Sequence, residues 1–560
     1  MKSQSLAWSV VPLFALGACA SVKPGATTGS DAGSTGTGGG NGGGTGGVSS
    51  TDAGSGTGGT PLPTSCAPTC TDFPADPIIV SGAPTDAPTM FGAPGGDSAG
   101  AGPCLSDPQD GTLFPGNWLR PRFAFTGGVG QNLFELRLHS DSEKNDLVVY
   151  TTTSPWAMPK DMWQALGRNV INKPITVTVR SLATAGANKT VSASAPSSFT
   201  IAPVGVNGSI VYWTTSMTSG GLSALKGFKV GDETVSTVMT PAMVDPTVQC
   251  IGCHVSTPDG AFIGMAVNKA PDHADPASLA IRSGTTGQEP AFLSASARML
   301  LSRPVQQVAA FSGGHWALGD HVGLSMYQDR DIIWTDLEAT SMAQDTAWGV
   351  IARTGDTGTP VSPTWSHDGM TVAYTSVKNG TTDTGLRVLS GLGSLYTVPY
   401  GARKGGAATV LKGGDDPSFH AYYPAFSPDD HYLAFTRAPS SGISYDIPAA
   451  EVFLLPREGA TTPTRLAAND PPKCSNRTSP GVTNSWPKWA PTVGLSSGTS
   501  YYWLTFSSRR LNGSPQIFIT ALTVTETGLV NTYPALYVWN QPATESNHTP
   551  AWDVFQISVQ

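Results

Sequence analysis

The sequence predicts an all-β protein with two folded parts, a β-sandwich followed by a longer array of repeated strands. Two observations predict this fold class. Between residues 104 and 205, short stretches alternate apolar and polar residues with a period of two, which is typical of strands. From residue 206 to residue 560, one strand-turn-strand pattern recurs along the chain. Neither part alternates strands with long amphipathic helices, so the pattern does not predict an α/β fold.

Residues 1–19 have the features of an export signal. The apolar run Leu6–Ala15 follows a positively charged start and is too short to span a bilayer. Leu16-Gly17-Ala18-Cys19 resembles the lipobox of bacterial lipoproteins, in which the cysteine is lipidated and becomes the mature N-terminus. The resemblance implies a membrane anchor on Cys19, and the absence of aspartate after it favours the outer membrane. We therefore expect an exported lipoprotein on the periplasmic side or at the cell surface.

Residues 20–103 are predicted to be a disordered tether. The segment is rich in Gly, Ser, Thr and Pro, as in Gly36–Gly44, which contains only Gly, Thr and Asn. Such a composition buries too little apolar surface to order itself. The tether would hold the folded part away from the membrane.

The segment 104–205 is predicted to be an immunoglobulin-like or fibronectin-like β-sandwich. Its size and its short alternating runs fit that architecture. No polar constellation in it suggests chemistry, so a spacer or docking role is expected. The predicted strands cover residues 120–125, 132–138, 146–150 and 174–180.

The repeats define the organisation of residues 206–560. Ser362–Thr375 matches Tyr423–Thr436 almost position for position, and looser copies occur before and after them. The copies follow one another at intervals of about 54 to 63 residues, which is typical of a repeat architecture. The aligned positions lie near Val255, Phe311, Trp365, Phe426, Trp489 and Trp552.

The signature Pro-x-Trp/Phe-Ser-x-Asp-Gly in these copies resembles the propeller repeats of the TolB family. The resemblance implies a six-bladed β-propeller over residues 206–560, with an aromatic residue in each inner strand and a tight Asp-Gly turn after it. Ring closure would pair the end of the chain with the strand-like segment that follows Gly208. The family differs in having an α/β domain before its propeller and no haem motif, so its partner-binding role is not carried over.

Cys250-Ile251-Gly252-Cys253-His254 has the spacing that attaches haem in c-type cytochromes. Two thiols add to the porphyrin vinyl groups, and the histidine takes an axial iron position. The motif predicts haem c bound by Cys250 and Cys253, with His254 as the proximal iron ligand. It should lie just before an inner strand, at the mouth of the propeller channel. Candidates for the second axial ligand are Met265, His273, His315, His321 and Met326, with His315 or Met265 preferred.

The same cysteines have another interpretation. In an exported protein, Cys250 and Cys253 are able to form a short-loop disulfide, which would leave His254 as an ordinary residue. Four further cysteines of the mature chain are predicted to form two disulfides, and the sequence does not determine their pairing. These are Cys66, Cys70, Cys104 and Cys474.

Charge and motif content limit the possible functions. The formal net charge of -8 argues against nucleic acid as a partner, because that would require a basic surface. The aspartates Asp259, Asp368, Asp429 and Asp430 recur with the repeats, so we expect them to cap turns. No catalytic residue set is found, and an enzyme activity would depend on haem. Two hypotheses remain, a binding or scaffold module for a protein, peptide or glycan, and a redox lipoprotein.

Overall fold

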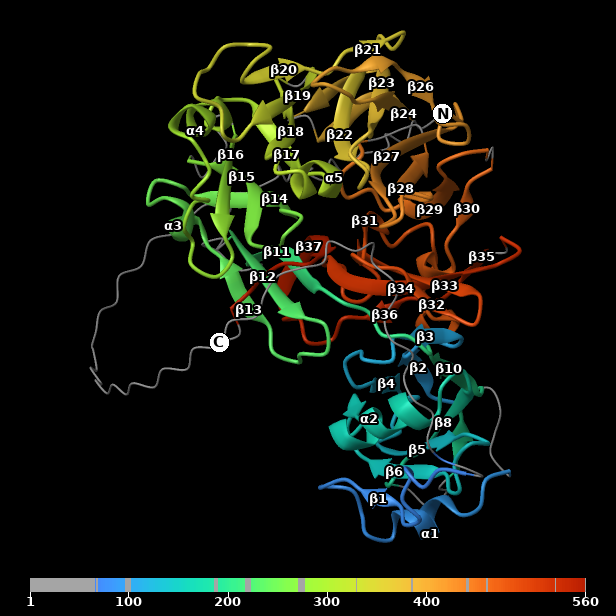
Figure 1. The fold of residues 1–560 in the computed structure, drawn as a ribbon. Coiled ribbons are helices and arrows are strands. Elements are labelled where there is room, and N and C mark those ends of the chain that lie inside the picture. The colour runs from blue at the N-terminus through green and yellow to red at the C-terminus, as the bar shows by residue number, and fades with distance from the viewer. Residues whose placement is uncertain are drawn as a thin grey trace, which may run out of the picture.

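The computed structural model describes residue 66 and residues 69–95, 102–185, 190–216, 223–269, 277–328, 330–383, 386–439, 443–459, 462–528 and 530–558. The predicted signal peptide, the lipobox with Cys19 and most of the predicted tether lie outside these residues. The chain is all-β, and Figure 1 shows a smaller N-terminal domain beside a larger group of sheets. In the described part of the chain, no helix has the length and apolar character needed to cross a membrane.

The N-terminal domain contains two sheets. The larger has seven strands and is mixed, because β1 pairs with β6 and β10 pairs with β3 in parallel. Strands lie where the alternating pattern predicted them, and the helix α2 (Lys160–Asn169) packs against them through Trp163 and Leu166. The large sheet has the order β1 (Ile78–Ile79), β6 (Leu147–Thr151), β5 (Leu133–His139), β8 (Pro174–Leu182), β10 (Ser197–Ile201), β3 (Thr112–Phe114), with β9 (Ser192–Ala193) beside β8. The small sheet has the order β2 (Cys104–Asp107), β4 (Arg122–Thr126), β7 (Trp156–Ala157).

The prediction that the disordered tether extends to residue 103 is wrong. Strand β1 and the short helix α1 (Ala87–Phe91) precede that position and belong to the domain. Phe73 and Ala87 are fully buried, and Phe91 is nearly so. These apolar side chains supply the burial that a Gly/Ser/Thr composition lacks, and they order the segment despite its prolines.

The two parts of the chain share one hydrophobic core. Phe114 and Trp118 of the N-terminal domain belong to the same buried cluster as Trp503, Ile517 and Trp552 of the C-terminal part. The rings of Trp118 and Trp552 lie 5.7 Å apart. The N-terminal domain is therefore packed directly onto the sheets, as Figure 1 shows beside β33 and β34.

Six sheets make up most of the C-terminal part. Their strands run antiparallel, and successive strands are adjacent. In chain order of their first strands they are β14 (Cys250–Ser256), β15 (Phe262–Asn268), β16 (Ser278–Ser283); β17 (Gln306–Ala310), β18 (Val322–Tyr327), β19 (Asp331–Asp336), β20 (Trp348–Val350); β22 (Thr359–Trp365), β23 (Thr371–Asp383), β24 (Arg387–Pro399), β26 (Thr409–Val410); β27 (Phe419–Phe426), β28 (Tyr432–Pro439), β29 (Glu451–Pro456), β30 (Thr464–Arg465); β31 (Ser485–Trp489), β33 (Thr499–Ser508), β34 (Gln516–Thr525), β35 (Val530–Thr532), with β32 (Gly494–Ser496) and β36 (Leu536–Tyr537) at its sides; and β37 (Glu545–Asp553), β11 (Ser209–Ser216), β12 (Ser223–Lys229), β13 (Ser236–Met239).

The chain ends meet in the last of these sheets. Strand β37, close to the C-terminus, pairs with β11, as in Ile210 opposite Trp552. This confirms the predicted pairing of the last strand with the segment after Gly208. The first strands β14, β17, β22, β27, β31 and β37 each contact the next one, and β37 contacts β14, so these contacts form a closed cycle.

Three of the four repeated aspartates cap turns, as predicted, whereas the Asp430 carboxylate accepts the backbone N–H groups of His367 and Asp368 in the neighbouring sheet. The hydroxyl groups of Thr257, Ser366 and Ser427 each donate a hydrogen bond of 2.6 Å to the aspartate two residues later. The same carboxylate oxygens accept the backbone N–H of residues 261, 370 and 431. This local hydrogen bonding favours the turn between the first and second strand of three sheets. The aspartates are Asp259, Asp368 and Asp429.

The remaining elements are short and lie between the sheets. They include a two-stranded parallel sheet and three helices that connect strands. Helix α4 begins with Ser294 as its N-cap, whose hydroxyl accepts the N–H of Ala297. These elements are β21 (Arg353–Thr354), β25 (Gly406–Ala407), α3 (Pro241–Val244), α4 (Ala295–Leu301), α5 (Gly313–Ala317), η1 (Ala467–Asn469) and η2 (Lys473–Ser475).

Two disulfides join Cys66, Cys70, Cys104 and Cys474, as predicted. Cys66 pairs with Cys70, and Cys104 pairs with Cys474 across 370 residues of sequence. The second bond links the N-terminal domain to the loop that precedes β31. The two parts of the chain are therefore joined by this covalent bond as well as by the shared hydrophobic core.

Candidate binding site at the centre of the six sheets

The first strand of every sheet carries a β-bulge at the same place. In each strand pair the register shifts at this point, because extra residues in one strand oppose fewer in the other. One non-glycine residue at each bulge has a positive φ, between 39° and 61°. The six residues are Cys253, Val308, Ser362, Tyr423, Trp486 and Thr549.

Proline follows the bulge residue in four of the six strands, as in Tyr423-Pro424 and Trp486-Pro487. Proline lacks an N–H, and the bulge is where the ladder is already interrupted, so the residue fits there. His254 occupies the equivalent place in β14, directly after the bulge residue Cys253. The repeat in the sequence therefore corresponds to a repeated backbone geometry in the six first strands.

Several bulge residues meet in one apolar group, which we call the central cluster. Cys253 and Tyr423 are buried in it, and Val308 and Trp486 pack at its edge. The rings of Tyr423 and Trp486 lie 4.5 Å apart, and those of Tyr422 and Tyr423 lie 4.9 Å apart. The cluster comprises Cys253, Ala266, Leu386, Tyr422, Tyr423, Ala438 and Ala450, with Val308, Ile447 and Trp486 partly buried against it.

Two segments between strands pack onto the central cluster. Leu386, at the start of β24, is 1% exposed, and its carbonyl oxygen accepts a hydrogen bond of 2.9 Å from the Ser362 hydroxyl. Ser444 lies on the other segment, and its hydroxyl accepts the N–H of Val388 at 2.9 Å. The first bond fastens Leu386 to the first strand β22, and the second fastens the Ser444 segment to β24, so the cluster is covered by chain from two sheets.

Polar groups surround the cluster and are largely desolvated. Burial raises the pKa of the Cys253 thiol to about 12, although the nearby charges of Arg387 and Lys488 favour the thiolate. Burial also raises the pKa of Tyr423 well above its usual range, so its phenol is neutral near pH 7. Burial lowers the pKa of Lys488 to about 8, against the opposite effect of Asp553. The site thus presents neutral hydroxyl and thiol groups beside cations.

A second aromatic contact extends this region toward β37. The Tyr445 hydroxyl lies 2.8 Å from Nδ1 of His548, and the His548 ring lies 4.3 Å from the ring of Trp213. Burial lowers the pKa of His548 to about 3, so its ring is neutral. Asp446, next to Tyr445, forms a bidentate ion pair with Arg509. Aromatic rings therefore lie next to hydrogen-bonding groups in this region.

His254 points away from the central cluster. Its Nε2 donates to the carbonyl oxygen of Val211 at 3.1 Å, which places the proton on that nitrogen. Its Nδ1 is buried and has no hydrogen-bond partner among the residues that the structure describes. Burial lowers the pKa of His254 to about 4, so the imidazole is neutral near pH 7.

The CxxCH motif lies inside a strand. The prediction that it precedes the inner strand is wrong, because β14 begins at Cys250 and pairs with β15 along its whole length. Cys250, Cys253 and His254 are each 7% exposed. The alternative prediction of a disulfide between the two cysteines is also wrong, since Cys253 is a free thiol.

The three side chains do not fit a haem attached at both cysteines in this conformation, and the Cys250 sulfur is already engaged in a disulfide bond. Cys253 belongs to the central cluster, whereas Cys250 packs with Trp213 and Ile251 between two sheets, and its sulfur lies 3.6 Å from the Ser223 hydroxyl. Haem attachment requires both sulfurs and the histidine to face one porphyrin. Here an apolar cluster holds each sulfur, and Val211 holds the imidazole.

The preferred candidates for the second axial ligand have other roles in the structure. Both ring nitrogens of His315 are engaged, Nδ1 with Asp320 at 2.8 Å and Nε2 with the Gly369 carbonyl oxygen at 3.1 Å. Met265 is fully buried in the apolar cluster that contains Cys250, on the strand next to His254. Neither side chain is brought to the central cluster.

Part of this region was not predicted from the sequence. Tyr423 and Trp486 stand directly before the proline of the repeat, and that fixed position was the signal that could have identified them. Leu386 and Arg387 carry no such signal, because they come from a hairpin arm outside the repeat. Their place at the centre follows from the length of β23 and β24, each of 13 residues.

A separate cleft of about 580 Å³ lies near the Asp-Gly turns. Its lining includes four acidic residues and Arg457. The carboxylates already accept hydrogen bonds from the protein, as Asp430 does from His367 at 2.9 Å. These hydrogen bonds connect neighbouring sheets. The cleft is lined by Asp368, Asp429, Asp430, His431, Tyr432, Pro456, Arg457 and Glu458.

No known protein family matches this sequence. No curated protein matches it either.

Among solved structures, hydrazine synthase of Kuenenia stuttgartiensis is similar with a TM-score of 0.38 and 10% identity, over 62% of this chain and 47% of that one. This chain therefore spans about half the length of that protein. A protein described as TolB from Agrobacterium tumefaciens has a TM-score of 0.31 and 11% identity, over 61% of this chain and 98% of that one. An α-L-arabinanase of Cellvibrio cellulosa has a TM-score of 0.24 and 11% identity, over 50% and 95%. These TM-scores and identities support no conclusion about function.

Proposed function

We propose that this chain is an outer-membrane-anchored lipoprotein whose six sheets form a six-bladed TolB-like β-propeller that acts as a binding module. The closed cycle of contacts among the first strands and the pairing of β37 with β11 support this architecture. The N-terminal domain, in the proposal an immunoglobulin-like or fibronectin-like sandwich, would hold the propeller on its tether. The lipobox motif at Cys19 supports the anchor.

The observation that carries the proposal is the convergence of Tyr423 and Trp486 beside Arg387. Aromatic faces with adjacent hydrogen-bond donors bind the apolar faces and hydroxyl or carbonyl groups of glycans and peptides. Trp486 is only partly buried at the edge of the central cluster, so its ring is the aromatic face that a ligand can reach. A protein segment, peptide or glycan at this end of the channel is therefore the proposed ligand class.

Binding arrays test this proposal with a matched pair of variants. The purified chain would be applied to an array of cell-wall glycans and to a library of short peptides. Trp486→Ala removes an aromatic face of the central cluster, whereas Trp348→Ala removes a tryptophan from β20, the outermost strand of its sheet. We expect the first variant to lose the wild-type binding pattern and the second to keep it. Equal binding by all three proteins would contradict the proposed site.

The alternative function is a redox lipoprotein with one haem c at Cys250, Cys253 and His254. The CxxCH spacing is the observation that favours it. Haem attachment would require β14 to release both sulfurs from their separate clusters. A haem stain of the wild type and of Cys253→Ser distinguishes the two functions, because covalent haem would give a stain that the variant loses.

A further inference from the structure

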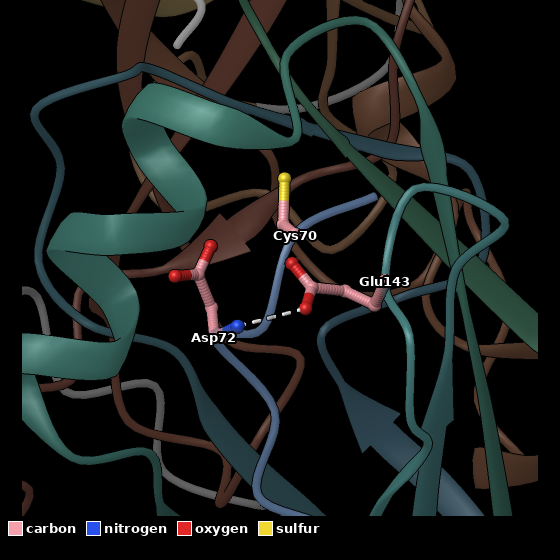
Figure 2. Close-up of side chains that lie close together, drawn as sticks. All are labelled: Cys70, Asp72 and Glu143. Atoms are coloured by element: carbon pink, nitrogen blue, oxygen red, sulfur yellow. Dashed lines mark hydrogen bonds between the residues drawn. The ribbon is translucent and has the colours of Figure 1, made fainter. Parts of the chain in front are cut away.

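The segment that follows the tether brings a cysteine and two carboxylates together. Cys70, Asp72 and Glu143 each present a ligand atom, and these atoms lie within 4.8 Å of one another. Cys70 and Asp72 come from the N-terminal segment, and Glu143 comes from the loop between β5 and β6. Figure 2 shows the three side chains and the hydrogen bond between Asp72 and Glu143.

The backbone holds these residues in place without any metal. The N–H of Cys70 donates to the Ser142 carbonyl oxygen at 2.7 Å, and the N–H of Lys144 donates to the Cys70 carbonyl oxygen at 2.9 Å. Asp72 is fixed by the Asn169 side chain, which donates to its Oδ2 at 2.8 Å. Such preorganisation lowers the entropy cost of binding an ion.

The carboxylate of Glu143 is only half satisfied. Its Oε2 accepts the N–H groups of Asp72 at 2.9 Å and Phe73 at 3.3 Å. Its Oε1 is buried and has no hydrogen-bond partner among the described residues, although the side chain is 7% exposed. Figure 2 shows this oxygen on the side of Cys70. A buried carboxylate oxygen without a partner is unfavourable unless it holds a proton or a cation.

Cys70 is bonded to Cys66, so its sulfur is not a thiolate in this state. Opening the bond with a dithiol reductant would convert the reductant to its cyclic disulfide and deliver two hydrogen atoms, one to each cysteine sulfur. The Cys70 thiol would release its proton on binding a metal, as coordinated thiols do. Thiolate and carboxylate together are ligands that zinc accepts in tetrahedral sites, with water in the remaining position.

We propose that Cys70, Asp72 and Glu143 form a zinc site that the Cys66–Cys70 disulfide masks and that its opening uncovers. The metal would then replace the disulfide in tying the end of the tether to the N-terminal domain. This inference does not depend on the proposed binding function of the propeller. It concerns a part of the chain that the binding site does not use.

The test uses Cys66→Ser in the full-length chain, which leaves Cys70 with a free thiol without a reductant. After removal of metals by dialysis against a chelator, Zn²⁺ is titrated by calorimetry and Co²⁺ by absorption spectroscopy. We expect one equivalent of either ion to bind, with a thiolate-to-cobalt charge-transfer band. The oxidised wild type should bind neither ion at this site.

Two double variants serve as controls. Cys66→Ser combined with Cys70→Ser lacks the disulfide equally but has no thiolate, and Cys66→Ser combined with Glu143→Gln keeps the thiol and the acceptor for the Asp72 N–H. Both should lose the cobalt band and the bound equivalent. Failure of the single variant to bind either ion would overturn the proposal. Equal binding by the Cys70→Ser double variant would overturn it as well, because the site would then not need the thiolate.

Discussion

The rings of Tyr423 and Trp486 occupy the same repeat position in neighbouring sheets and lie with their centroids 4.5 Å apart. Both residues have a positive φ and precede a proline. A repeat that is visible in the sequence as Pro-x-Trp/Phe therefore places the residue before the proline at the centre of the sheets. The central cluster depends on this backbone geometry as much as on its apolar side chains.

The bulge geometry predicts an unusual order of stability at Val308, whose φ is 59°. A side chain is strained in this conformation and glycine is not. We expect Val308→Gly to be more stable than Val308→Ala by about 1 kcal/mol, although glycine removes more of the side chain. Chemical denaturation of both variants measures this difference. At Val322, an ordinary strand residue, the order should reverse, and the same order at both positions would contradict the strain.

The Cys104–Cys474 disulfide should contribute strongly to stability. It closes a loop of 370 residues, and the entropy that a cross-link removes from the unfolded chain grows with loop length. Replacing both cysteines by serine should lower the free energy of unfolding by about 2–5 kcal/mol. Replacing Cys66 and Cys70, which are four residues apart, should cost less. Denaturant midpoints of the two double variants test this order, and a larger loss for the Cys66/Cys70 pair would refute it.

Because burial lowers the pKa of His254, we expect the protein to lose stability in mild acid. The unfolded histidine takes up a proton near its ordinary pKa of 6.5, whereas burial delays protonation of the folded state until about pH 4. Stability therefore falls as pH falls from 6.5 to 4, by up to about 3 kcal/mol from this residue. His254→Gln, which can still donate to Val211, should flatten this part of the profile. An unchanged profile for His254→Gln would argue against a buried neutral ring.

The lipobox-like sequence at Cys19 predicts that the protein is attached to a membrane. Lipidation at this residue would supply several acyl chains, which makes membrane attachment stable. Cys19→Ser should move the protein from the membrane fraction to the periplasmic fraction and abolish labelling with radioactive palmitate. Labelling that persists in the variant would exclude Cys19 as the modified residue.

The sequence predicted the parts of the structure that rest on local patterns. The strands of residues 120–180 and the Asp259, Asp368 and Asp429 turns follow from alternation and from local hydrogen bonding, which a short window of sequence contains. The order in residues 69–95 was missed. It depends on Phe73 and Phe91 finding a core that lies far away in the chain, and the composition of the segment hides them.

The candidate site was predicted only in part. The motif at Cys250 was identified by spacing, but spacing does not reveal that a bulge at Cys253 turns this sulfur toward Tyr423 while Cys250 packs elsewhere. Leu386 was missed because its position depends on the long arm of β24 rather than on the repeat. Tertiary contacts therefore decide which residues of the repeats reach the centre.

The most direct test of the account is a pyridine haemochrome spectrum with an intact mass, recorded on the chain expressed with a cytochrome c maturation system. Cys253 is a buried free thiol in the central cluster, which we propose to be a ligand-binding site. We therefore expect no covalent haem band and a mass without haem. A c-type band together with the added mass of one haem would contradict it and establish the redox alternative.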